Sequence, residues 1–370
     1  MGGPLLSQGA LALLVLTSCT AWTNPCRQGH VCTVMGNGEL GFNGAGLDAL
    51  ETRLASPTSV STSPDGLIAV TDYSNMLIRI LKEDGTIETI AGNGTHAYSE
   101  IGANALETPL ENPIDSKWGP DGRLYILPQH EGRLIAINAD GSVERIAGTG
   151  EIGDSGDGGD ALDATMGYGG GFDFGPDGSI YISDNTYSRI RHIRPDGSIR
   201  TILGIGQGGI DPTGYGPDTP IRFPERIRVD ANHNRLLVTD TMNHRLLAID
   251  LDSLQTQAIA GTGEPGAPEE GSLALLAPLH APVGVEIDPQ GGILVSDLEN
   301  MVVRRIDPDG QLSTIAGTTN ESEELLHSAP ALDFPMNRPA GLAWTPTGDL
   351  LIAERSGHRV LQLNGLADDL

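Results

Sequence analysis

Residues Phe172–Gly204 read FDFGPDGSIYISDNTYSRIRHIRPDGSIRTILG and decide the fold class. This stretch contains four short segments rich in aromatic or β-branched residues, at Phe172–Gly175, Ser179–Asp184, Arg189–Ile193 and Ser198–Leu203. Asp177-Gly178 separates the first two segments and Asp196-Gly197 separates the last two, and such dipeptides favour tight hairpin turns. We therefore predict a sheet of four antiparallel strands, followed by a connector rich in glycine, proline and acidic residues.

The same unit recurs along the whole chain. The dipeptide that ends the fourth strand recurs at intervals of 56, 56, 56, 57 and 56 residues, at Met35-Gly36, Ala91-Gly92, Ala147-Gly148, Leu203-Gly204, Ala260-Gly261 and Ala316-Gly317. A second landmark, mostly acidic, follows the second strand at Asp72, Pro128, Asp184, Asp240, Asp297 and Glu354. Repeats of this length with four strands each are typical of the blades of a β-propeller.

The two ends of the chain predict how the ring closes. The last copy, Ala340–Asn364, lacks its fourth strand, whereas Val31–Gly36 reads as such a strand with no copy before it. We therefore predict an all-β, six-bladed β-propeller with four-stranded antiparallel blades. In this 3+1 closure the N-terminal strand completes the last blade and removes an exposed strand edge.

Composition agrees with this fold class and limits the partners. The 370 residues include 50 glycines, and a glycine inside a helix costs about 1 kcal/mol relative to alanine, which excludes a helical bundle. The chain has 22 Lys and Arg against 49 Asp and Glu, a formal charge of −27. Such a chain repels phosphate groups, so we expect no nucleic-acid binding and no direct binding to anionic membranes.

The N-terminal region predicts export. Residues 10–16 (ALALLVL) form an apolar run typical of a signal peptide. The run is too short for a transmembrane helix, because about 20 apolar residues are needed to span a bilayer. Leu16-Thr-Ser-Cys19 resembles the bacterial lipobox. This resemblance implies a signal peptide at 1–18, lipidation of Cys19, a tether at 19–30 and a propeller at 31–370. The protein would then be anchored by lipid in the bacterial cell envelope, in the periplasm or at the outer membrane; an apolar leader without lipidation, giving a secreted protein, is the alternative.

Cysteine usage agrees with an oxidising compartment. Cys26 and Cys32 bound the short loop CRQGHVC, and outside the cytoplasm such a pair is expected to form a disulfide. The alternative is a metal site that includes His30, which lies between the two cysteines.

Several copies resemble the NHL repeat. The resemblance is carried by PVGVEID at 282–288, ILVSD at 293–297, Asn300 and STIAG at 313–317, and by DTMNHRL at 240–246. GDGGDA at 156–161 is similar to linkers of bacterial members. The resemblance extends over residues 31–364 and implies a TolB-like, six-bladed propeller of bacterial lipoprotein type. It does not specify an activity, because NHL propellers include protein-binding and RNA-binding modules and a few lyases and hydrolases.

Charged residues on the inner strands are the main candidates for a binding site. Four residues after the residue that opens each inner strand stand Lys117, Asp173, Arg228 and Glu286, in consecutive blades and with alternating charge. Asp115 and Arg226 stand two residues earlier on the same side of their strands. Because inner strands meet at the propeller axis, this alternation predicts either ion pairs between blades or a polar ligand pocket on the axis.

Two other patterns suggest metals. The connector residues Asp154, Asp157, Asp160 and Asp163 offer oxygen ligands for calcium, although their spacing differs from that of an EF-hand. Three histidines, His130, His244 and His358, lie in the loops after the second strands of alternate blades, and three convergent imidazoles would hold a catalytic zinc. Since alternate blades are expected to lie too far apart, we predict no cofactor, with calcium or zinc as alternatives.

Two classes of function follow. The leading hypothesis is a monomeric, non-catalytic binding scaffold outside the cytoplasm, which contacts a protein, peptide or glycan through the face with the long connectors. The alternative is a hydrolase or lyase acting in the central channel, with a divalent metal as a possible cofactor. The sequence contains no Gly-x-Ser-x-Gly motif and no cysteine after Cys32, so neither common nucleophile motif supports an enzyme.

Overall fold

The computed structural model describes residues 26–206, 214–319 and 325–369. Cys19 and the predicted signal peptide lie outside the described residues. Within the described residues, no helix is long and apolar enough to cross a membrane.

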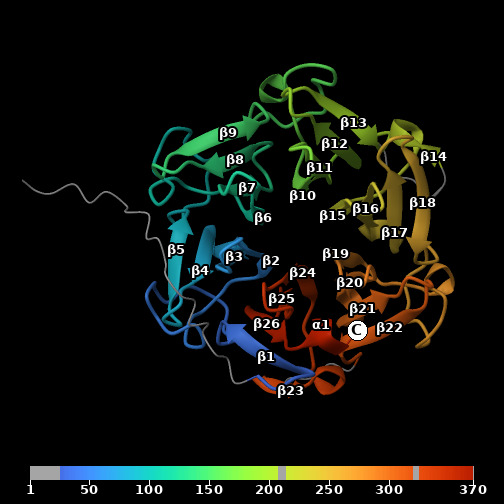
Figure 1. Cartoon of the computed structure of the whole chain (residues 1–370). Helices are drawn as coiled ribbons and strands as arrows, with labels where there is room; N and C mark the ends of the chain where they lie inside the picture. Colours follow the sequence, from blue (N-terminus) through green and yellow to red (C-terminus); the bar gives the residue numbers. More distant parts are fainter. Residues whose placement is uncertain (1–25, 207–213, 320–324, 370) are drawn as a thin grey trace, which may run out of the picture.

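Six antiparallel sheets surround a central axis, and their innermost strands lie closest to it (Figure 1). Each blade has four strands, which follow chain order from the axis outward in blades 1 to 5, whereas in blade 6 the fourth strand is β1. Blades 1 to 3 are β2 (Pro57–Thr62), β3 (Ile68–Asp72), β4 (Leu77–Leu81), β5 (Ile87–Ala91); β6 (Pro113–Trp118), β7 (Leu124–Pro128), β8 (Leu134–Ile137), β9 (Val143–Ala147); and β10 (Gly169–Phe174), β11 (Ile180–Asp184), β12 (Arg189–Ile193), β13 (Ile199–Leu203). Blades 4 to 6 are β15 (Pro224–Asp230), β16 (Arg235–Asp240), β17 (Arg245–Asp250), β18 (Gln255–Ala260); β19 (Pro282–Ile287), β20 (Ile293–Asp297), β21 (Val302–Ile306), β22 (Leu312–Gly317); and β24 (Pro339–Trp344), β25 (Leu350–Glu354), β26 (Arg359–Leu363), β1 (His30–Met35).

The remaining elements are short. Two extra strands, β14 (Gly214–Tyr215) and β23 (Ser328–Pro330), extend blades 4 and 6 to five strands. Single turns of 3-10 helix lie in the loops: η1 (Tyr73–Asn75), η2 (Ala161–Asp163), η3 (Gly216–Asp218), η4 (Thr241–Asn243), η5 (Ala274–Leu276), η6 (Leu298–Asn300) and η7 (Ala331–Asp333). A four-residue helix, α1 (Leu366–Asp369), ends the described chain.

The predicted 3+1 closure is confirmed. β1 pairs antiparallel with β26, with Val31 opposite Leu363 and Thr33 opposite Leu361. Its other edge pairs with β23, so β1 is an internal strand of blade 6. Val31, Leu361 and Leu363 belong to one buried apolar cluster, which explains why this strand is as hydrophobic as the fourth strands of the other blades.

Backbone geometry explains why a glycine stands at the end of each outer strand. At Gly92 and its five equivalents φ lies between +82° and +96°, a region that residues with a Cβ rarely adopt. A Cβ at Gly92 would lie 2.2 Å from the carbonyl oxygen of Met76, the residue directly before the neighbouring strand β4. The dipeptide that marks the repeat in the sequence is therefore a requirement of backbone packing.

The acidic landmark is also structural. In five blades its carboxylate accepts a hydrogen bond from the backbone N–H two residues before the inner strand, as Asp72 does from Ala55 at 2.6 Å. Asn75 donates its side-chain amide to Asp72 as well. Buried arginines complete the contact at one of two places on the third strand, at its first residue (Arg245, Arg359) or its third (Arg79, Arg304). Blade 2 has Pro128 at the landmark position and lacks this arrangement.

Candidate functional site

A hollow of about 670 Å³ lies on the axis, bounded by the inner strands of all six blades. It extends from the third residue of the inner strands (Ser59, Asp115 and Arg226 among them) to the turns that follow those strands. All six axial residues named from the sequence line it: Asp115, Lys117, Asp173, Arg226, Arg228 and Glu286. The volume falls within the range of about 300–1,000 Å³ typical of small-molecule pockets.

Arg226 forms the floor of the hollow. This buried side chain reaches from blade 4 across the axis and donates hydrogen bonds to backbone carbonyls of blades 1, 2 and 3. Its Nη2 lies 2.9 Å from the oxygens of both Thr58 and Ile114, and its Nη1 bonds the carbonyl of Gly170. Because one guanidinium satisfies three carbonyls that point at the axis, Arg226 joins four blades at this level.

Asp115 supports the floor from blade 2. It is fully buried, and its carboxylate accepts a hydrogen bond from the Ser59 hydroxyl at 2.6 Å and one from the Phe172 backbone N–H at 3.2 Å. These contacts connect blades 1, 2 and 3. The geometry therefore gives Asp115 and Arg226 a structural role at the base of the hollow.

The other four charged residues form a ladder of ion pairs above this floor. Lys117 Nζ lies 3.3 Å from Asp173 Oδ1, Arg228 Nη1 lies 3.5 Å from the same oxygen, and Arg228 Nε lies 2.8 Å from Glu286 Oε1. The ladder thus follows blades 2, 3, 4 and 5 in order. The cations are the more accessible members, since the side chains of Lys117 and Arg228 are 20% and 35% exposed, against 6% and 7% for Asp173 and Glu286. A molecule in the hollow therefore contacts the N–H groups of Lys117 and Arg228 more readily than the carboxylates of Asp173 and Glu286.

Burial and charge act in opposite directions on the two carboxyl groups. Burial disfavours ionisation of Asp173, but Lys117, Arg228 and the Val229 N–H outweigh it and hold the pKa of Asp173 below its usual range. At Glu286 burial prevails over the attraction of Arg228, and the pKa of that carboxyl is raised. The charge of Glu286 in turn raises the pKa of Arg228.

Aromatic and hydroxyl side chains form the wall of the hollow. Trp118, Phe174 and Trp344 line it on blades 2, 3 and 6, and all three are partly exposed. The indole N–H of Trp344 donates to the Ile287 carbonyl at 2.8 Å, which fixes that ring between blades 5 and 6. On blade 1 the wall consists of Ser61 to Ser63.

The remaining sequence candidates lie elsewhere. A disulfide joins Cys26 to Cys32 at the start of β1. In the acidic connector, Asp154 pairs with Arg189 and Asp157 with Arg191, and Asp160 caps η2 by accepting from the Leu162 N–H.

The three loop histidines have different neighbours. His358 Nδ1 accepts from the Ser56 N–H, and His244 Nδ1 accepts from the Ala281 N–H beside the ring of His280. His130 lies near Glu111 and His96, two residues that the sequence patterns did not single out. A position-by-position comparison of blade 2 with the other five blades could have revealed His96 and Glu111.

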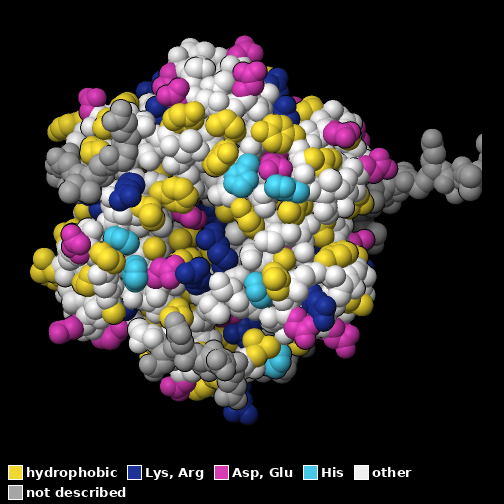
Figure 2. Space-filling model, turned by 180° about the vertical axis from the view of Figure 1, so that it is seen from behind, with side chains coloured by type: hydrophobic (Ala, Val, Ile, Leu, Met, Phe, Trp, Pro, Cys, Tyr) yellow, Lys and Arg dark blue, Asp and Glu magenta, His cyan; other side chains and the backbone are white. Residues whose placement is uncertain are grey.

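The face of the propeller that carries the connectors is a surface distinct from the hollow. Lys and Arg side chains gather near its centre, although the chain as a whole is strongly acidic (Figure 2). Arg355 of blade 6 lies 3.7 Å from Glu225 of blade 4, and Arg338 pairs with Glu299 at 3.0 Å. Hydrophobic side chains lie around this centre (Figure 2), and the connectors and loops on this side expose Phe42, Tyr98, Tyr168, Phe223 and Met242.

The blade pattern, the ring closure and the landmark contacts define a six-bladed β-propeller whose repeats resemble the NHL repeat. The model of the Teneurin NHL domain matches residues 158–333. NHL repeat-containing protein 2 of Bos taurus is 25% identical over 291 residues, which cover 70% of this chain and 39% of that protein. The chain is thus a six-bladed β-propeller that is similar to NHL-repeat proteins. It spans only 12% to 39% of the length of the first three curated relatives that it matches.

Solved structures share the fold at low sequence identity. An auxiliary nutrient binding protein from Bacteroides thetaiotaomicron superposes with a TM-score of 0.66 and 14% identity, over 90% of this chain and 75% of that one. A gluconolactonase from Xanthomonas campestris superposes with a TM-score of 0.57 and 11% identity, over 90% of this chain and 88% of that one. At these identities the likeness concerns the fold alone.

Proposed function

We propose that this protein is an exported binding propeller that holds a glycan in the axial hollow. The observation that carries the proposal is the ladder of Lys117, Asp173, Arg228 and Glu286, which lies above the floor of a pocket with aromatic walls. Its accessible N–H groups suit the hydroxyl and carboxylate oxygens of a sugar, and Trp118, Phe174 and Trp344 offer apolar faces. Pockets of this kind, mostly apolar with a few fixed polar groups, are typical of small-molecule binding.

A hydrolase or lyase in the channel has less support. Asp173 and Glu286 are engaged by Lys117 and Arg228, and Asp115 accepts hydrogen bonds from Ser59 and Phe172. A general base needs a carboxylate or imidazole within reach of substrate and free to take a proton. The axial carboxylates do not form a three-residue metal-binding group among the residues that the structure describes.

The two lysines of the chain provide a matched experiment. Lys117 lines the hollow, whereas Lys82 lies at the end of β4, 41% exposed, next to Asp84 and Glu88. We expect isothermal titration with a panel of neutral and acidic oligosaccharides to reveal a ligand whose affinity falls at least about tenfold in Lys117→Met, since a charge-assisted hydrogen bond contributes roughly 1.5–3 kcal/mol. Lys82→Met should bind like the unmodified protein. Equal affinities of the two variants, or no binding to any glycan of the panel, would contradict the proposal.

The proposed location is the cell envelope. The apolar run at 10–16, the Cys19 motif and the disulfide between Cys26 and Cys32 support export, because disulfides persist in oxidising compartments. We propose that Cys19 is lipidated and that the propeller acts at the membrane surface through this anchor alone.

A further inference from the structure

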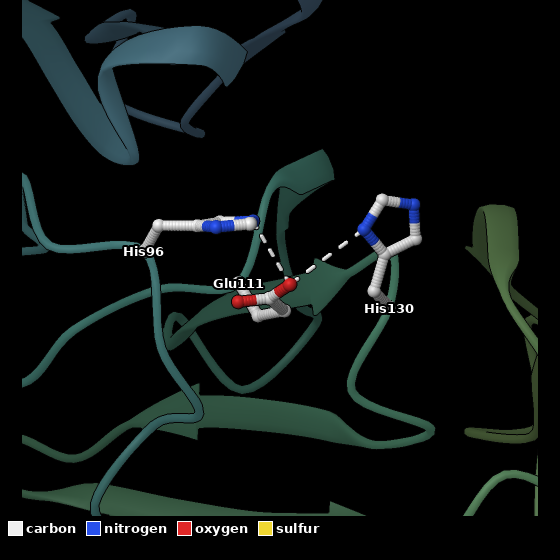
Figure 3. A group of neighbouring side chains, drawn as sticks. All are labelled: His96, Glu111 and His130. Atoms are coloured by element: carbon white, nitrogen blue, oxygen red, sulfur yellow. Dashed lines mark ion pairs between the residues drawn. The ribbon is translucent and has the colours of Figure 1, made fainter.

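Three potential metal ligands meet at the connector side of blade 2. His96 lies on the connector between β5 and β6, Glu111 lies two residues before β6, and His130 lies on the loop after β7 (Figure 3). Glu111 Oε1 is 2.9 Å from His96 Nε2 and 3.7 Å from His130 Nδ1. One ligand atom from each of the three residues lies within 4.8 Å of the others.

These separations suit one small cation. Zinc binds imidazole nitrogen and carboxylate oxygen at about 2.0–2.2 Å, which places tetrahedral ligand atoms about 3.4 Å apart. The separations of Glu111 Oε1 from the two imidazole nitrogens, 2.9 and 3.7 Å, lie on either side of this value. Two imidazoles and one carboxylate are also a ligand set that zinc sites with an open coordination position use. The ligand atoms of His96 and His130 lie within 4.8 Å of each other, so side-chain rotations can bring all three ligand atoms around one ion.

Among the described residues, Glu111 has no ion-pair partner that is always positively charged. Its side chain is only 12% exposed, and in residues 26–206, 214–319 and 325–369 its ion-pair partners are the two imidazoles, with no lysine or arginine within 4 Å. Buried carboxylates are normally paired with a cation or bound to a metal, because an isolated buried charge is costly. A divalent ion held between Glu111 and the histidines would supply the missing positive charge.

Comparison of the six blades shows that packing does not require this group. The position of Glu111 is occupied by Ala55, Gly167, Arg222, His280 and Asn337 in the other blades. In those five blades the backbone N–H at this position donates to the landmark carboxylate, which blade 2 has replaced by Pro128.

His96 departs from the repeat as well. Its equivalents Leu40, Ile152 and Pro265 each form a β-bridge to the segment before the next inner strand. Blade 2 therefore differs from the other blades at several neighbouring positions at once, and three of the new side chains converge.

Neighbouring groups hold the ligands in place. The ring of Tyr168, from blade 3, packs on His130 with centroids 4.5 Å apart, and the Tyr98 hydroxyl donates to the His130 carbonyl. Asn112 Oδ1 lies 2.6 Å from His96 Nε2, so the metal-free imidazole has its proton directed at this oxygen. Metal binding at Nε2 therefore requires the other neutral tautomer of His96, which carries its proton on Nδ1.

We propose that His96, Glu111 and His130 form a zinc site on the connector face, with a coordination position open to solvent. The side chains of His96 and His130 are 54% and 34% exposed, so the ion can take an external oxygen ligand such as a carboxylate. This site is separate from the axial hollow, whose lining contains none of the three residues. The proposal does not depend on the glycan-binding function.

The test is Zn²⁺ binding by the mature protein with its disulfide intact, after removal of metal with a chelator. Isothermal titration should give one site per chain, and Glu111→Gln and His96→Ala should each weaken binding at least about tenfold, since each removes one of only three protein ligands. His233→Ala is the matched control, because His233 is an exposed histidine paired with Asp230 at 2.8 Å, and it should bind zinc normally. In addition, Co²⁺ should give the intense visible absorption of a tetrahedral site, and this band should be missing in Glu111→Gln.

Several results would overturn the proposal. Zinc affinity that is equal in the unmodified protein, Glu111→Gln and His96→Ala would show that these residues are not ligands. A site lost only in His233→Ala would place the metal elsewhere. A Co²⁺ spectrum like that of the hydrated ion would exclude a tetrahedral site.

Discussion

Arg228→Met tests the ion-pair ladder most directly. This arginine lies between two carboxylates, 3.5 Å from Asp173 and 2.8 Å from Glu286. After its removal Asp173 keeps Lys117 and the Val229 N–H, whereas Glu286, with only 7% of its side chain exposed, loses its cationic partner. The loss of stability should therefore come mainly from Glu286.

The size of the effect follows from the burial. Two opposite charges 4 Å apart attract by about 4 kcal/mol at an effective dielectric constant of about 20. Since the Arg228 side chain is 35% exposed, solvent screening reduces this to about 2–3 kcal/mol. Arg228→Met combined with Glu286→Leu removes both charges and should recover most of the loss, because replacing both partners of a buried pair with apolar residues is often nearly neutral.

The assay is urea unfolding followed by tryptophan fluorescence, applied to the unmodified protein, both single variants and the double variant. A pH series adds an independent measurement. Glu286 already has a raised pKa because of burial, and loss of Arg228 raises it further, so the folded state retains a proton that the unfolded chain has released. The stability deficit of Arg228→Met should accordingly be smaller at pH 5 than at pH 7. If the single and double variants are equally unstable, or if the deficit grows on acidification, the ladder does not stabilise the protein as described.

Two further predictions concern other parts of the chain. His192 is 9% exposed and stacked on Tyr181, and burial, assisted by Arg200 and Arg194, lowers its pKa from 6.5 to about 4. The contribution of His192 to stability is complete above the unfolded pKa of 6.5 and is lost as the pH falls toward 4. Urea unfolding should therefore show that the unmodified protein loses about 2 kcal/mol of stability between pH 7.5 and pH 5, a loss that His192→Phe does not share. Parallel pH profiles of the two proteins would contradict this prediction. Lipidation predicts that mass spectrometry of the mature N-terminus shows an acylated Cys19, and an unmodified cysteine or an intact leader would exclude the anchor.

The fold could be predicted because the repeat supplies the same information six times. Gly92 and its equivalents mark a backbone conformation that every blade needs, so their spacing gives the number of blades and their order. The closure could be predicted because β1 keeps the hydrophobic pattern of an outer strand. The ladder could also be predicted, since equivalent positions on neighbouring inner strands are necessarily close in a ring.

Side chains outside the repeat pattern were harder to assign. Its loop groups His130 with His244 and His358, yet His130 stands two residues after the landmark, whereas the other two stand four residues after it. His96 and Glu111 are separated by 15 positions and belong to no motif, and only the folding of the connector brings them together. Similarly, the fully buried Arg79, Arg191 and Arg304 lie at the third residue of their strands, where no motif in the sequence marks them.

Ring closure by β1 has a consequence for the order of folding. Val31 and Leu363 are 332 positions apart (363 − 31), whereas Ile249 and Thr256, paired in a single hairpin, are 7 apart (256 − 249). Because the entropic cost of loop closure grows as about (3/2)RT ln n, joining β1 to β26 costs about 3 kcal/mol more than closing that hairpin. The first described strand to be synthesised therefore pairs only after the final blade has been made. Until β1 pairs with it, β26 presents an open strand edge that can pair with other chains.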